Sequence, residues 1–286
     1  IATRSDPPLP IARLRARGQV VELRAADLRF TEPEAAQFLN DVMSLHLNDR
    51  SVTLLEDRTE GWAAGLQMAA LSMHDREDVG GFVEGFSGTN RHILDYLLEE
   101  ILTSQPPEIQ HFLQYTSILE RLSSPLCDAL LTGDEMPEHS DEDRGHYLDL
   151  LSEKQSVSIL EYLEQENLFL VSLDDERFWF RYHHLFADLL RARLHQTQPV
   201  LVPLLHIRAS VWLEQNGFIP DAIQHLFAVH KYGRAANLIE RYGPIYWRES
   251  DPSIVQMVDN LPFDMLIARP KIGFYWAWFL IIQGRI

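Results

Sequence analysis

The chain has 286 residues, of which 46% are apolar, and carries a formal net charge of −17. This charge argues against direct nucleic-acid binding, which depends on Lys and Arg side chains that neutralise phosphates. The single cysteine, Cys127, excludes an internal disulfide framework and favours a reducing compartment, so we expect a cytoplasmic protein. The longest apolar run, residues 274–282, is far shorter than the roughly 20 residues of a membrane span, so no membrane partner is expected.

The first region, residues 1–88, starts abruptly without a methionine, in a manner typical of the end of a buried strand. We therefore expect an internal piece of a larger protein. A loop punctuated by prolines follows, and then Thr31 and Glu34 fit a capping box at the start of an amphipathic helix. Two further helices are predicted, one over residues 52–57 and one over the run of small residues at 63–71.

The second region, residues 89–195, has the outline of a winged helix. Apolar residues at helical spacing lie before and after two short apolar runs, 168–173 and 178–182, which a polar tetrapeptide of hairpin type separates. Further helices are predicted over 92–102, from Pro106 and from Ser124. The helix before the hairpin and the tip of the wing are both acidic, so we interpret this winged helix as a switch module and not as a DNA-binding element.

A histidine pair, His183 and His184, lies where the second wing strand becomes a helix. The N-terminus of a helix has unpaired N–H groups and a partial positive charge, so it suits an anion such as phosphate. A histidine at this position could donate a further hydrogen bond to that anion. The alternative is a partly buried histidine pair that caps the helix.

Other polar clusters favour no metal site. Residues 134–143 contain six acidic residues and no basic one, and we interpret them as a solvated loop because their spacing fits no EF-hand. His225 and His230 are five residues apart and therefore do not share a helix face well.

The third region, residues 196–286, is predicted to consist of helix pairs. A helical pattern around Leu204–Leu213, a turn with Gly217 and a second helix from Ala222 resemble a tetratricopeptide unit, in which small residues lie where helices cross. Two or three such units are too few for a complete solenoid, so we expect the start of a TPR-like superhelix.

Residues 180–190, Phe-Arg-Tyr-His-His-Leu-Phe-Ala-Asp-Leu-Leu, resemble the Met-His-Asp motif of the STAND-class signalling ATPases. The match is closest to the MalT-like, LuxR-family transcription activators. His183 takes the place of the motif histidine, which in that family lies on the winged helix and contacts the phosphates of bound ADP. His184 stands where the plant-type motif has aspartate, so the resemblance carries over His183 only.

Residues 1–88 resemble the distal, helical part of the nucleotide-binding domain of that family. Thr3 and Arg4 match the sensor motif whose arginine reaches the γ-phosphate, while Gly65 and Gln67 match a Gly-x-Pro motif near the adenine, with Gln67 in place of the proline. The resemblance implies ATP or ADP as cofactor, with Mg²⁺ in the full-length protein. Taken alone, Arg4 is as well explained as a solvated residue, and Gly65 as a site of close helix packing.

The sequence contains no P-loop, since no glycine is followed by lysine. We therefore expect this segment alone not to be catalytic, whereas the resemblance implies a slow ATPase for the full-length protein. A hydrolase that uses the histidines is disfavoured, because the chain has neither a nucleophile in a glycine elbow nor a His-Glu-x-x-His motif.

The expected fold class is mainly α. It comprises the distal part of a P-loop-type nucleotide-binding domain (1–88), a winged helix with a β-hairpin wing (89–195) and the start of a TPR-like superhelical domain (196–286). The resemblance implies the regulatory core of an ATP-dependent, ligand-responsive transcription activator. An inducer or regulatory protein would bind the superhelix, the active form would self-associate, and DNA would be bound by a LuxR-type helix-turn-helix outside this segment. The alternative is a TPR-like interaction scaffold without nucleotide switching.

Overall fold

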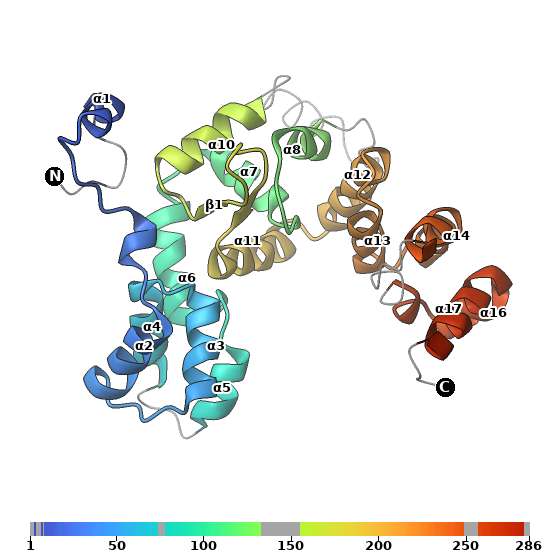
Figure 1. The fold of residues 1–286 in the computed structure, drawn as a ribbon, viewed down its shortest axis with the longest axis horizontal. Helices are drawn as coiled ribbons and strands as arrows, with labels where there is room; N and C mark the ends of the chain where they lie inside the picture. Colours follow the sequence, from blue (N-terminus) through green and yellow to red (C-terminus); the bar gives the residue numbers. More distant parts are fainter. Residues whose placement is uncertain are drawn as a thin grey trace. The chain divides into compact units, whose positions relative to one another are not determined.

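The computed structural model describes residues 3, 7, 9–73, 78–132, 155–248 and 257–282 (Figure 1). The chain divides into two compact units. The first comprises Ile1–Ser124 and Gln155–Thr197, and the second comprises Pro125–Lys154 and Gln198–Ile286. Arg4 and the acidic run 134–143 lie outside the described residues. In the parts of the chain that the structure describes, no helix combines the length and apolar character needed to cross a membrane.

The first unit is mainly helical and carries one β-hairpin, as the sequence predicts. Its helices before the hairpin are α1 (Ile11–Ala16), η1 (Ala25–Leu28), α2 (Glu32–Gln37), η2 (Phe38–Val42), α3 (Asp49–Thr59), α4 (Ala63–Met73), α5 (Val79–Gly85), α6 (Arg91–Leu97), η3 (Leu98–Leu102), α7 (Pro107–Thr116) and α10 (Gln155–Gln165). The predicted boundary at residue 88 lies within this unit, and the three-domain division stays a prediction.

Local capping residues explain where two of these helices begin. The capping box predicted for α2 is confirmed, because the carboxylate of Glu34 accepts a hydrogen bond of 2.9 Å from the backbone N–H of Thr31. Asn48 caps α3, and its side-chain oxygen accepts a hydrogen bond of 2.9 Å from the backbone N–H of Ser51. The helix that we predict over 52–57 is therefore longer than its apolar pattern indicates.

The hairpin pairs β1 (Leu170–Ser172) with β2 (Phe180–Tyr182) in antiparallel register, with Val171 opposite Arg181. Asp174 holds the turn, since its carboxylate accepts hydrogen bonds from the backbone N–H groups of Phe178 (2.8 Å) and Trp179 (2.9 Å). On its other side β2 forms an isolated bridge with Leu122. This arrangement confirms the predicted wing and fixes the direction in which β2 leads into the next helix.

That next helix, α11 (His184–Thr197), is central to the packing of the first unit. It contacts α3, α6 and α7. Phe186 on α11 is fully buried, as are Phe86 and Phe112. Burying an aromatic side chain of this size stabilises a fold by roughly 2–3 kcal/mol. The N-terminus of α11, where the histidine pair lies, is therefore held by a well-packed core.

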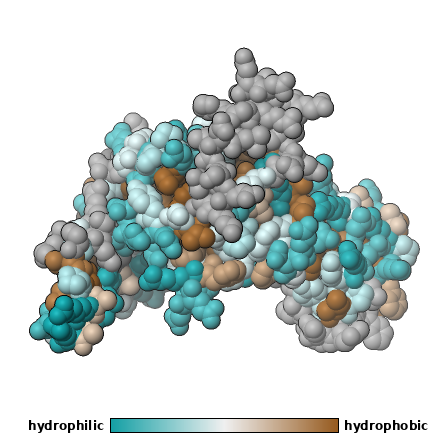
Figure 2. Space-filling model, turned by 90° about the horizontal axis from the view of Figure 1, so that it is seen from above, coloured by the Kyte–Doolittle hydropathy of each residue, from teal (hydrophilic) through white to brown (hydrophobic). Residues whose placement is uncertain are grey.

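The second unit is helical throughout its described residues. Its helices are α8 (Ser124–Leu131), α12 (Leu201–Gln215), α13 (Ile219–Ala228), α14 (Tyr232–Arg248), α16 (Phe263–Ala268) and α17 (Pro270–Ile282). The turn between α12 and α13 contains Gly217 at φ +84°, as the helix-turn-helix prediction requires. Cys127 on α8 is fully buried, and burial raises the pKa of its thiol well above its usual value. In Figure 2 the visible described surface is mostly hydrophilic or neutral, with smaller apolar patches.

Candidate functional site

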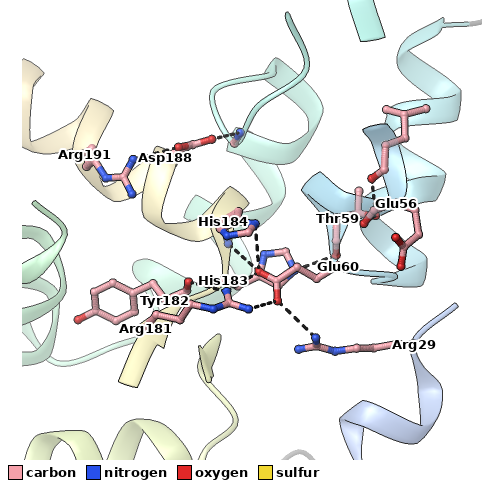
Figure 3. Close-up of polar contacts among 12 residues, drawn as sticks. Arg29, Glu56, Thr59, Glu60, Arg181, Tyr182, His183, His184, Asp188 and Arg191 are labelled. Carbon is pink, nitrogen blue, oxygen red and sulfur yellow. Dashed lines mark hydrogen bonds and ion pairs between the residues drawn. The ribbon is translucent and has the colours of Figure 1, made fainter. Parts of the chain in front are cut away.

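The candidate site is built around the α3–α4 turn, residues 59–62, which faces the start of α11 (Figure 3). Two successive residues of this turn have left-handed backbone conformations, Glu60 at φ +51° and Gly61 at φ +68°. Gly61 is required here for a second reason, because a Cβ atom at this position would overlap the backbone of Phe30. The backbone N–H of Phe30 also donates a 2.8 Å hydrogen bond to the carbonyl of Gly61. The turn therefore has a defined shape that places the Glu60 side chain.

His183 closes the other side of the site and is only 3% exposed. Its Nε2 lies 2.8 Å from the carbonyl oxygen of Thr59, the last residue of α3. A carbonyl can only accept, so Nε2 donates the proton and Nδ1 carries a lone pair in the neutral ring. Among the described residues, Nδ1 is buried without a hydrogen-bond partner. Burial also lowers the pKa of His183 below its ordinary value, so the ring is neutral near pH 7.

The carboxylate of Glu60 lies between three segments of the first unit. Arg181 on β2 donates two hydrogen bonds to it, at 2.7 and 3.0 Å, and Arg29 lies 3.3 Å away. The backbone N–H of His184, the first residue of α11, also donates a hydrogen bond to this carboxylate, at 3.1 Å. Burial alone would raise the pKa of Glu60, but the Arg181 and His184 hydrogen bonds help to lower it to about 2. Glu60 is therefore an ionised, largely buried anion, with its side chain 7% exposed.

The other predicted site residues lie at different places. Arg4 is outside the described residues, and Thr3 is exposed. Gly65 is buried in α4, where a Cβ atom would lie 2.7 Å from the Trp62 ring. Gln67 is exposed on the same helix. The Trp62 ring is also 6.1 Å, centroid to centroid, from the His183 ring. Trp62 therefore lies between Gly65 and His183 and contacts both.

Sequence reasoning missed Glu60, which is the most highly connected residue of the site. Its partners Arg29 and Arg181 lie 31 and 121 residues away along the chain, so no local pattern joins them to Glu60. Two features come closest to a signal. Arg181 adjoins the histidine pair, and Glu60 precedes a glycine in a helix-ending turn.

Three of the four basic residues nearest the wing, all but Arg193, form ion pairs within the first unit. Arg177 pairs with Glu164 at 3.4 Å, Arg181 with Glu60, and Arg191 with Asp188 at 3.3 Å. These guanidinium groups would have to leave their carboxylates in order to neutralise phosphates of DNA. The arrangement supports the interpretation of the winged helix as a switch module.

We therefore expect no submicromolar binding of duplex DNA by this chain, measured by fluorescence anisotropy at low salt. A variant with lysines at the exposed wing-tip positions Asp175 and Glu176 provides the reference, since added positive charge should produce weak, salt-sensitive binding. Submicromolar binding by the unaltered chain with a steep dependence on salt would contradict the expectation.

In the parts of the chain that the structure describes, no group of three or more His, Cys, Asp or Glu side chains is placed to hold a metal ion. His225 lies within α13, whereas His230 lies beyond its C-terminus, so the two do not share a helix face. The partner of His225 is instead His206 on α12, and their Nδ1 atoms are 2.8 Å apart. That pair belongs to the second unit.

Comparison with known proteins identifies the segment that contains the hairpin and the histidine pair. Residues 98–202 match the family model described as the MalT winged helix domain. This segment is a MalT-like winged helix. The similarity to MalT extends beyond it along the whole chain and confirms the MalT-like resemblance that the sequence motifs indicate.

Two kinds of protein are among those similar to this chain. The chain is 33% identical over 278 residues to the serine/threonine-protein kinase PknK of Mycobacterium tuberculosis. The aligned region covers 97% of this chain and 23% of that protein. It is 30% identical to the HTH-type transcriptional regulator MalT of Yersinia enterocolitica over 286 residues and to that of Serratia proteamaculans over 288 residues. These matches cover 99% and 100% of this chain. The chain thus spans 30% of the length of either MalT protein.

Proposed function

We propose that this chain is the regulatory core of a nucleotide-dependent, ligand-responsive transcriptional regulator of the MalT type. In this proposal ATP or ADP, with Mg²⁺, is bound mainly by parts of the protein that are not in this chain. The winged helix senses the nucleotide through His183, an inducer or regulatory protein binds the helical repeats, and the active form self-associates. DNA is bound through a separate helix-turn-helix.

The observation that carries the proposal is the state of His183. A buried ring nitrogen without a partner is costly, and each case calls for an explanation such as a missing ligand. The Nδ1 atom of His111 is another such atom among the described residues, so the orientation of the His183 ring matters as well. His183 combines an unpartnered Nδ1 with a fixed orientation, set by the Nε2 hydrogen bond to Thr59. A phosphate at Nδ1 would supply the missing partner, and the ring would then take up a proton so that both nitrogens donate.

The comparison proteins support a regulatory role. Almost the whole chain aligns with proteins whose names give two different outputs, a transcriptional regulator and a protein kinase. A segment common to both is better suited to control an output than to perform one. The shared segment therefore argues against a role for this chain that is specific to transcription or to phosphorylation.

The remaining predicted nucleotide contacts form part of the same proposal. Arg4 and Thr3 would approach the γ-phosphate, and Gln67 would lie near the adenine. Gly65 would act through packing, because the absence of a side chain lets Trp62 lie against α4 beside His183. The residues present therefore suit one wall of a nucleotide site, while the phosphate-binding loop would come from elsewhere in the protein.

His183→Ala in the full-length protein tests this function. We expect the affinity of the variant for ADP to fall about tenfold or more, because a hydrogen bond to a charged group contributes roughly 1.5–3 kcal/mol. The purified variant should therefore retain less ADP. Basal transcription should rise, since ADP is proposed to hold the inactive state. Nucleotide content of the purified protein and reporter expression without inducer are the measurements.

His195→Ala provides the matched control, because His195 is an exposed histidine in the last turn of the same helix, away from the α3–α4 turn. This variant should retain ADP as the unaltered protein does. Equal ADP content and equal basal transcription in the His183 variant and the unaltered protein would refute the proposed role.

A further inference from the structure

The N-terminus of α11 already holds an anion, and that anion belongs to the chain itself. The Glu60 carboxylate accepts two hydrogen bonds from Arg181 and one from the first backbone N–H of α11. Arg29 adds a second guanidinium at 3.3 Å. A guanidinium fork and the N–H groups of a helix N-terminus are the donors that a phosphate group takes in proteins.

The carboxylate is brought there by a strained backbone. Glu60 adopts the left-handed conformation at φ +51°, which is unfavourable for a residue with a side chain. Beside it lies His183, whose Nδ1 is buried and unpartnered among the described residues. The Glu60 carboxylate therefore satisfies the arginines and the helix end but leaves the Nδ1 atom of His183 without a partner.

We propose that Glu60 is an intramolecular competitor for a phosphate group. Its carboxylate fills a subsite formed by Arg181, Arg29 and the N-terminus of α11, and a phosphate binds there only when Glu60 leaves. The assignment of that phosphate to a nucleotide rests on the proposed function, whereas the subsite itself does not. Inorganic phosphate is the other source that the same donors would accept.

Displacement of Glu60 would alter more than the subsite. Glu60 connects the end of α3 to Arg29 before α2, to β2 and to α11. Once it leaves, the contact between the α3–α4 turn and the winged helix depends mainly on the His183–Thr59 hydrogen bond and on the packing of Trp62. The exchange of one anion for another thus shifts the population between a closed and a loosened contact, and both anions act through the same arginines.

The experiment uses the 286-residue chain with the substitution Glu60→Gln, which keeps the size of the side chain and removes its charge. Inorganic phosphate, pyrophosphate and ADP are titrated separately and followed by calorimetry and by amide NMR shifts. We expect all three to bind the variant about tenfold more tightly or better than the unaltered chain, because the competing carboxylate is gone. The shifts should centre on the first turn of α11 and on the α3–α4 turn.

Two further variants make the result specific. Glu56→Gln removes the same charge one turn earlier on α3. Its carboxylate lies apart from Arg181 in Figure 3 and interacts with Arg29 without a hydrogen bond, so this variant should change binding much less than Glu60→Gln does. Adding Arg181→Gln to Glu60→Gln should abolish the gain. If Glu60→Gln fails to fold by circular dichroism, Glu60→Asp, which withdraws the carboxylate by one methylene, should still show a several-fold gain.

The outcomes separate the two proposals. Tighter binding of phosphate and pyrophosphate without tighter binding of ADP would support the subsite and count against its use by a nucleotide. No gain for any of the three, or an equal gain in Glu56→Gln, would overturn the competitor role of Glu60. The His183→Ala test in the full-length protein judges the nucleotide switch independently.

Discussion

Replacing Gly88 with alanine is expected to destabilise the first unit by about 3 kcal/mol, near the upper end of the usual cost of overpacking. Gly88 is buried, and a Cβ atom there would overlap the carbonyl oxygen of Leu185 and lie 2.7 Å from its carbonyl carbon. The obstacle is backbone in the first turn of α11, so no side-chain rotation can relieve it. The loop after α5 would have to move away from α11 and would disturb the core around Phe186.

Urea denaturation followed by circular dichroism measures this effect. Gly85→Ala is the matched control, since Gly85 lies three residues earlier at the end of α5 with open space around its Cα. Alanine is the better helix former, so this control should be neutral or slightly stabilising. Equal costs for the two substitutions would show that α11 can shift freely, in conflict with the packing described above.

The second large effect concerns acid. The Nδ1 atoms of His206 on α12 and His225 on α13 are 2.8 Å apart, so one ring donates to the other and this hydrogen bond is lost when both rings are protonated. Burial, with a smaller contribution from His206, lowers the pKa of His225 to about 3 from an ordinary 6.5. The unfolded chain thus binds a proton that the folded chain does not, and the stability from this group is lost as the pH falls below 6.5.

At pH 5 this loss is on the order of 2 kcal/mol relative to pH 8. The free energy of unfolding, measured with urea at both pH values, should fall from pH 8 to pH 5 in the unaltered chain. In His225→Gln this fall should be smaller by the amount given above. His230→Gln supplies the control, because His230 is exposed and its ring forms a 2.8 Å hydrogen bond with Tyr232, apart from the His206–His225 pair. An identical pH response in all three proteins would show that the pair is already open in the folded state.

The parts of the fold that follow from local chemistry could be predicted from the sequence. Thr31 and Glu34 are three residues apart, so their capping box is visible in the sequence and is confirmed in the structure. The hairpin is equally local, since Asp174 both breaks the apolar pattern and accepts the hydrogen bonds that close the turn. Helix lengths were less predictable, because Asn48 caps α3 ahead of its apolar stretch.

The candidate site depends on distant pairings, and these could not be predicted. The position of His183 at the start of a helix was predicted, but its contact with Thr59 spans 124 residues. The expectation that a helix N-terminus at this position suits an anion was chemically sound, yet the anion found there is Glu60. For the same reason the sequence brings His225 together with its neighbour His230, whereas its partner in the structure, His206, lies 19 residues earlier on α12.

The burial of Cys127 has a practical consequence for experiments on the switch. Its thiol is enclosed in α8 and remains protonated at neutral pH, so it offers neither access nor a thiolate to maleimide reagents. Since it is the single cysteine of the 286-residue chain, that chain is in effect already a cysteine-free background for labelling. Fluorophores attached to cysteines introduced at exposed positions such as Gln67 and Asp175 would report the separation of α4 and the wing as anions are added.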